Sequence, residues 1–129
     1  MFEDNTEAKF SLDELMGLRE PGTYLVRASG DSMVGVGIFD KDLMVVDKGR
    51  DAENGNVIIA AINNEPLVKI YHREPDGQII LMSANPKYAP RYILESESFW
   101  IWGVVVNSVR RHGKYQGEGE LPRTGEEGV

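Results

Sequence analysis

Short runs of β-branched and aromatic residues, each closed by a turn sequence, dominate this chain of 129 residues. Such side chains suit a pleated, half-buried strand, and Gly, Pro, Asn and Asp favour the turns between strands. Six runs have this character: 24–27, 43–46, 57–61, 67–71, 78–82 and 99–109. Little helical periodicity lies between them, so the sequence predicts a mostly β domain of short, largely antiparallel strands.

One short helix is expected before the first strand. Ser11-Leu12-Asp13-Glu14 has the pattern of a capping box, in which the serine and the glutamate satisfy each other's backbone N–H groups. Gly17 follows where a glycine commonly ends a helix. We therefore expect one helical turn over residues 12–16.

Composition divides the chain into three parts. Residues 113–129 are acidic, rich in glycine and without apolar periodicity, which is typical of a flexible tail. Residues 1–9 have a similar character, and we expect them to form a flexible arm. Residues 10–112 then form the folded domain.

Charge, cysteine content and hydropathy exclude several classes of protein. The chain carries 14 basic and 21 acidic residues, a net charge of −7, so we expect no direct nucleic-acid partner. It has no cysteine, which excludes disulfides, thiolate metal sites and cysteine nucleophiles. No apolar run approaches the roughly 18 residues of a membrane span. We therefore expect no membrane partner and a cytoplasmic location.

The two histidines give no indication of a metal or cofactor. His72 and His112 lie forty residues apart, and neither has neighbours at the spacing of metal ligands. No glycine-rich loop of the phosphate-binding kind precedes a helix. We expect neither a metal nor a cofactor, and neither histidine lies in a motif typical of a Ser-His-Asp triad.

The polar segment that follows the first predicted strand contains a candidate nucleophile, Ser32. If the chain turns sharply at Gly30, Ser32 becomes exposed, and the N–H groups of Asp31 and Ser32 point toward one place. That geometry is required of an oxyanion hole. An ordinary turn with Ser32 as a capping residue explains the same pattern.

Lys69 is the second candidate, because it interrupts an apolar strand-like run. A buried lysine has a lowered pKa, and its neutral amine can accept a proton from a serine hydroxyl. A serine nucleophile with a lysine base needs no histidine. The alternative is an exposed lysine on an edge strand, where it discourages aggregation.

Trp100 and Trp102 alternate in the last predicted strand. Aromatic and β-branched alternation of this kind suits a strand with one buried face. The two side chains therefore belong to the core or to a subunit interface, and the core is the expectation.

Four blocks of the sequence, in order between about residues 10 and 110, resemble the LexA/UmuD family of self-cleaving serine peptidases. They are Ala28-Ser29-Gly30-Asp31-Ser32-Met33 with Gly37-Ile38-Phe39-Asp40-Lys41-Asp42-Leu43, Asn54-Gly55-Asn56-Val57-Ile58-Ile59-Ala60 with Val68-Lys69, Asn85-Pro86-Lys87-Tyr88-Ala89-Pro90, and Trp102-Gly103-Val104-Val105. Within the family the chain is most similar to UmuD, and in length to its processed form UmuD′.

The resemblance implies a fold, a site and partners. It implies the LexA/UmuD C-terminal peptidase-like fold over residues 10–112. It also implies Ser32 as nucleophile, Lys69 as general base, and the backbone amides of Asp31 and Ser32 as the oxyanion hole. The partners implied are a second copy of the chain, the RecA filament and a UmuC-like Y-family DNA polymerase, which the protein would serve in SOS mutagenesis. Two alternatives stand beside this role, a serine peptidase acting in trans on a UmuD- or LexA-like chain and a non-catalytic dimeric binding module.

The chain departs from the family pattern at several points. It contains no Ala-Gly or Cys-Gly dipeptide, so we do not expect self-cleavage at the usual bond. Only 31 residues precede Ser32, and from this we expect no repressor role. Lys41 replaces a usual glycine, which would cost about 1 kcal/mol if that position needs a positive φ.

Overall fold

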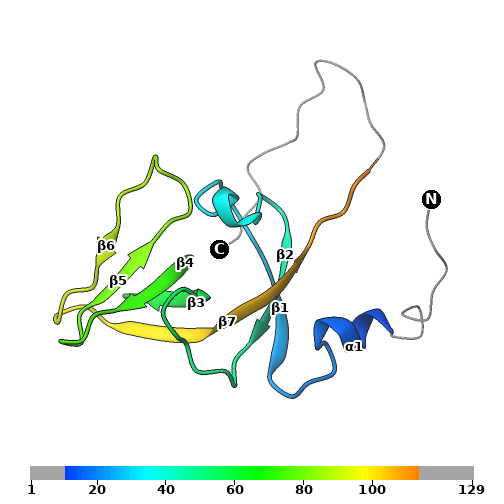
Figure 1. Cartoon of the computed structure of the whole chain (residues 1–129), viewed down its shortest axis with the longest axis horizontal. Helices are drawn as coiled ribbons and strands as arrows, with labels where there is room; N and C mark the ends of the chain where they lie inside the picture. The colour runs from blue at the N-terminus through cyan, green and yellow to red at the C-terminus, as the bar shows by residue number, and fades with distance from the viewer. Residues whose placement is uncertain (1–10, 114–129) are drawn as a thin grey trace.

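The computed structural model describes residues 11–113, which form one seven-stranded antiparallel sheet (Figure 1). The mostly β fold expected from the sequence is therefore confirmed. The strands lie in the order β1-β2-β7-β3-β4-β5-β6. Their bounds are β1 Thr23–Arg27, β2 Leu43–Asp47, β3 Val57–Ile62, β4 Glu65–Arg73, β5 Ile79–Met82, β6 Arg91–Tyr92 and β7 Phe99–Val109.

The predicted helix is present as α1, Leu12–Met16. Ser11 and Glu14 form the capping box, and Gly17 ends the helix in the left-handed conformation with φ 73°. Because an L side chain is disfavoured at this φ, glycine is the residue suited to that position. No helix within residues 11–113 has the length and hydropathy needed to cross a membrane.

Six strands follow the predicted runs, and the run 99–109 coincides with β7. The sequence did not predict β6 or η2, a single 3₁₀ turn over Val34–Val36. Two residues are too few to show an alternating pattern, and β6 forms because Tyr92 pairs with Ile80 of β5. The predicted arm 1–9 and residues 114–129 of the predicted tail lie outside the described residues.

The long strand β7 lies inside the sheet, between β2 and β3, and joins its two parts (Figure 1). It pairs with β2, where Val105 lies opposite Val46, and with β3, where Val104 lies opposite Ile58. The core is correspondingly divided into two clusters. The first includes Met33, Ile38, Met44, Val46, Ile59 and Val68, and the second Ile58, Ala60, Ile62, Tyr71, Leu81 and Val104.

The expectation that Trp100 and Trp102 lie in the core is wrong. They are 64% and 43% exposed. The buried residues of β7 are Gly103 and Val104, and neither tryptophan belongs to the two clusters of buried residues in the described part of the chain. Alternation showed that one face of β7 is buried but could not show which half of this long strand the core reaches.

Candidate active site

The turn that carries Ser32 begins directly after β1. The chain turns at Gly30, which has φ 87°, and the N–H of Gly30 donates to the Asp40 carboxylate at 2.8 Å. The sharp turn expected at Gly30 is therefore present. Ser32 is half-buried, and Met33, not Ser32, is the N-cap residue of η2 and makes no side-chain capping bond. The interpretation of Ser32 as a capping residue is wrong.

A small hollow of about 10 Å³ lies beside Ser32. Its walls come from the turn and from β4, and its lining residues are Ala28, Ser29, Gly30, Ser32, Met33, Ile38 and Val68. A hollow of this size has room for a single small group or one water molecule. The N–H groups of Asp31 and Ser32 donate to no other residue in the described part of the chain, so both are available to a ligand. Their role as an oxyanion hole stays a prediction.

Lys69 lies in β4, which has β3 on one side and β5 on the other. The interpretation of Lys69 as an edge-strand lysine is therefore wrong. Its side chain is half-buried, and burial lowers the pKa of the amine below the ordinary lysine value. Nζ donates a hydrogen bond to Ser83 Oγ at 2.7 Å and lies 5.6 Å from the centre of the Tyr88 ring.

Ser32 and Lys69 are brought to the same region of the fold without a hydrogen bond between them. Val68, the residue before Lys69, lines the hollow beside Ser32 and packs in one core cluster with Met33. Within residues 11–113, no hydrogen bond joins Ser32 Oγ to Lys69 Nζ. The two side chains are related instead through residues 83–85.

Residues 83–85 form hydrogen bonds both with Lys69 and with the turn that carries Ser32. Ser83 accepts the hydrogen bond from Lys69. The carbonyl of Ala84 accepts from the N–H of Gly35 at 2.7 Å, and the side chain of Asn85 donates from Nδ2 to the carbonyl of Asp31 at 2.8 Å. This short segment therefore fixes the distance between β4 and the turn that carries Ser32.

A second set of polar contacts holds Asp31. Lys87 Nζ lies 2.9 Å from Asp31 Oδ2, and the hydroxyl of Tyr88 donates to Oδ1. The hydrogen bond from Tyr88, followed by that from Lys87, lowers the pKa of the Asp31 carboxyl. The same contact raises the pKa of the Tyr88 hydroxyl. The residue next to Ser32 is thus an anion held by two partners from one loop.

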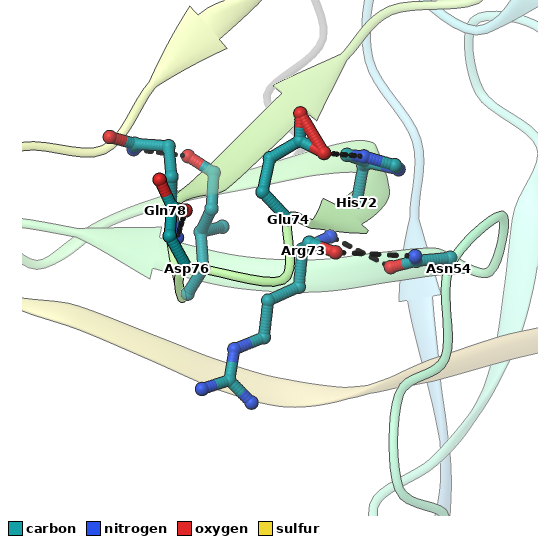
Figure 2. A network of polar contacts seen from close by, with 7 residues as sticks. Asn54, His72, Arg73, Glu74, Asp76 and Gln78 are labelled. Carbon is teal, nitrogen blue, oxygen red and sulfur yellow. Dashed lines mark hydrogen bonds and ion pairs between the residues drawn. The ribbon is translucent and has the colours of Figure 1, made fainter.

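Neither histidine takes part in this arrangement. His72 Nε2 lies 3.0 Å from Glu74 Oε2, at the end of β4 where Asn54 also hydrogen-bonds the backbone of Arg73 (Figure 2). His112 is exposed beyond the end of β7. No group of three or more potential metal ligands was found within residues 11–113.

The sequence profile of the Peptidase S24-like family matches residues 1–106. The chain belongs to the Peptidase S24-like family. The resemblance to the LexA/UmuD peptidases is thereby confirmed. The LexA repressor of Syntrophotalea carbinolica is 42% identical over 89 residues, which is 69% of this chain and 44% of that protein. The LexA repressor of Leptospira interrogans serovar Lai is 39% identical over 108 residues, which is 84% of this chain and 51% of that protein.

The chain thus spans about half the length of the curated LexA repressors it matches. Lys41, which replaces a usual glycine, has φ 76°, so the position does require a left-handed backbone.

Sequence reasoning missed Ser83 as a partner of Lys69. A signal for it was nevertheless present in the turn Pro75-Asp76-Gly77. Ile70 pairs with Met82, so the hairpin is centred on Asp76, and continuing the register by one residue places Ser83 opposite Lys69.

Proposed function

We propose that this chain is a serine peptidase of the LexA/UmuD type, with Ser32 as nucleophile and Lys69 as general base. The observation that carries the proposal is the environment of Lys69. Burial lowers the pKa of its amine, and the preceding residue, Val68, lines the hollow beside Ser32. A lysine in this setting supplies a neutral amine closer to physiological pH than an exposed lysine does.

The reaction would proceed through an acyl-serine. Neutral Lys69 Nζ takes the proton from Ser32 Oγ while Oγ forms a bond to the peptide carbonyl carbon. The lysine then gives this proton to the leaving nitrogen as the C–N bond breaks. Water then attacks the acyl carbon and gives a proton to Lys69, which returns it to Ser32 Oγ as the ester bond between Oγ and the acyl carbon breaks. The N–H groups of Asp31 and Ser32 would hold the carbonyl oxygen while it is negative.

The test is cleavage in trans followed by mass spectrometry between pH 7 and 10. The substrate is a LexA-type chain that has an Ala-Gly bond and an alanine in place of its own nucleophilic serine. We expect cleavage at Ala-Gly that increases with pH as Lys69 loses its proton, and no cleavage by Ser32→Ala. Lys69→Arg keeps the positive charge but cannot act as a base near these pH values, so it should also be inactive.

Two substitutions on exposed residues serve as matched controls. Ser96→Ala removes a hydroxyl and Arg111→Lys conserves a charge, and both positions are exposed. Both controls should cleave as the unaltered chain does. Cleavage by Ser32→Ala would overturn the assignment of the nucleophile, and an inactive unaltered chain that is folded would overturn the proposed activity.

The proposed cellular role is that of a UmuD′-like accessory subunit in SOS mutagenesis. In this role a cytoplasmic homodimer binds a UmuC-like Y-family DNA polymerase and responds to the RecA filament. The motif blocks support this role, whereas similarity to proteins named LexA repressor supports processing of the LexA type. Sedimentation with a purified UmuC-like polymerase distinguishes the accessory-subunit role from LexA-type processing, because a stable complex is expected only for the accessory subunit.

An exposed apolar surface on β1 and β7 supports the homodimer. Trp100 is 64% exposed, and Tyr24, Ile101 and Trp102 line a hollow of about 640 Å³ with Gly22, Thr23 and Lys48. Neighbouring exposed apolar side chains are typical of protein interfaces. Trp102→Glu should therefore lower the sedimentation coefficient, whereas Tyr92→Glu, on an exposed aromatic of β6, should leave it unchanged.

A further inference from the structure

We propose that Ser83 is a positioning residue for Lys69, a role that rests on the Ser32–Lys69 activity proposed above. The hydroxyl of Ser83 lies 2.7 Å from Lys69 Nζ and accepts its hydrogen bond. Both side chains are half-buried. Ser83 touches the base and not the reacting peptide, so it acts through Lys69.

A lysine base needs such a partner because its side chain is long and flexible. Four methylene groups and a freely rotating amine carry many rotamers, and a base works only when its lone pair faces the proton it removes. Partial burial of the side chain limits the motion of the Lys69 stem but does not by itself fix the rotation of the amine. In the described part of the chain, Ser83 supplies the hydrogen bond that fixes the rotation of this amine.

The hydrogen bond to Ser83 uses one N–H group of the neutral Lys69 amine and does not use its lone pair. A neutral lysine has two N–H groups and one lone pair. When one N–H donates to Ser83 Oγ, the lone pair is directed away from Ser83 and stays available to the hydroxyl of Ser32. After proton transfer, the ammonium keeps Ser83 as an acceptor, which stabilises the charged form.

The location of Ser83 gives it a second connection to the site. It begins the segment 83–85, in which Ala84 accepts a hydrogen bond from Gly35 and Asn85 donates to the carbonyl of Asp31. The group that orients Lys69 is therefore attached to the turn that carries Ser32. A shift of this segment relative to the turn would therefore change the position of the base relative to the nucleophile.

The decisive variants are Ser83→Ala, Ser83→Thr and the control Ser96→Ala, whose residue is exposed and outside the site. The pKa of Lys69 is measured first, without any activity, from the pH dependence of its acetylation by acetic anhydride, followed by mass spectrometry. In Ser83→Ala the ammonium loses an acceptor, so the Lys69 pKa should fall. Ser83→Thr and Ser96→Ala should titrate as the unaltered chain does.

Cleavage of the LexA-type substrate chain is the second readout. Loss of orientation in Ser83→Ala should lower the rate about 10-fold to 100-fold, less than loss of a general base itself. The midpoint of its pH profile should move to lower pH, and Ser83→Thr should restore both rate and midpoint. A structural defect would lower the rate at every pH and leave the midpoint in place.

The two proposals fail in different ways. An unshifted Lys69 titration in Ser83→Ala overturns the role of Ser83, whatever the cleavage result. An unshifted midpoint or an unchanged rate in Ser83→Ala overturns it as well. If the unaltered chain does not cleave but its Lys69 titration responds to Ser83→Ala, the peptidase proposal fails, while the coupling of Ser83 to Lys69 stands.

Discussion

Arg110 holds the buried carboxylate of Asp42 with two hydrogen bonds, from Nε to Oδ1 at 2.9 Å and from Nη2 to Oδ2 at 3.1 Å. Nη2 also donates to the carbonyl of Gly37, and the guanidinium lies 4.1 Å from the centre of the Phe39 ring. The Asp42 side chain is 1% exposed. These contacts fasten the loop that follows Ser32 to the end of the last strand.

Arg110→Gln should destabilise the fold. The substitution leaves the Asp42 carboxylate buried without its cation, and loss of charged hydrogen bonds of this kind costs about 2–3 kcal/mol. Urea unfolding should show a lower midpoint with an unchanged slope. Arg111→Gln, on the exposed neighbouring residue, is the control and should stay within about 0.5 kcal/mol of the unaltered chain. Equal stability of the two variants would show that the Asp42–Arg110 pair contributes nothing.

The Asp42–Arg110 pair also predicts how the free energy of unfolding changes at acid pH. Burial acts to raise the pKa of Asp42, but hydrogen bonds from Arg110 and from the N–H of Phe39 outweigh it, so the pKa is lowered. Below about pH 4 the unfolded chain therefore binds more protons than the folded one, and stability falls as pH falls toward the lowered pKa.

Asp42→Asn should make this dependence on pH shallower. The relevant quantity is the slope of the free energy of unfolding against pH below about 4, not its absolute value, because the amide also weakens the bond to Arg110. Asp51→Asn, on an exposed carboxyl between β2 and β3, is the control. A slope equal to that of the unaltered chain would assign the acid sensitivity to other carboxyls.

Local patterns predicted the elements well, but not the arrangement of distant ones. The capping box at Ser11 and the turn around Asp76 depend on neighbouring residues, so they can be identified in one sequence. The insertion of β7 between β2 and β3 depends on pairing across many residues, and no short pattern records it. For the same reason, the exposure of Trp102 was not predictable.

The candidate site likewise has a part that could be predicted from the sequence and a part that could not. Ser32 and Lys69 were found because each is a polar interruption with a known chemical use, supported by the family motif. The contacts that relate them come from residues 83–85, whose side chains are ordinary in the sequence. The turn around Asp76 indicates that Ser83 lies opposite Lys69, but only the three-dimensional structure shows that the two are hydrogen-bonded and that Asn85 donates to the carbonyl of Asp31.

Glycine should be more stable than alanine at position 41. The φ of 76° disfavours an L side chain, so Lys41→Gly should be about 0.5–1 kcal/mol more stable than Lys41→Ala, and both variants lack the interactions of the lysine side chain. Lys48→Gly and Lys48→Ala are the matched controls, since the φ of Lys48 is not positive, and there the glycine variant should be the less stable one. Thermal and urea unfolding of the four variants would check the order, and a Lys41→Ala at least as stable as Lys41→Gly would contradict it.

Gly35 marks the closest approach between the Ser32 turn and residues 83–85. Its N–H donates to the carbonyl of Ala84 at 2.7 Å, and a Cβ at position 35 would lie 2.5 Å from that oxygen. Gly35→Ala must therefore push the two backbones apart, which costs about 1–3 kcal/mol. Because the displaced segment carries Ser83, cleavage of the LexA-type substrate chain should also fall.

The control for Gly35→Ala is Gly49→Ala. Gly49 has no positive φ, and the nearest atom to its added Cβ would be Asp47 Oδ1 at 3.5 Å, an ordinary contact. Cleavage is compared in both variants at a temperature where urea titration shows each to be fully folded, so that lost stability is separated from lost alignment. A folded Gly35→Ala with full activity would mean that the base and the nucleophile stay aligned when the backbones separate, and that contacts other than Gly35–Ala84 set their distance.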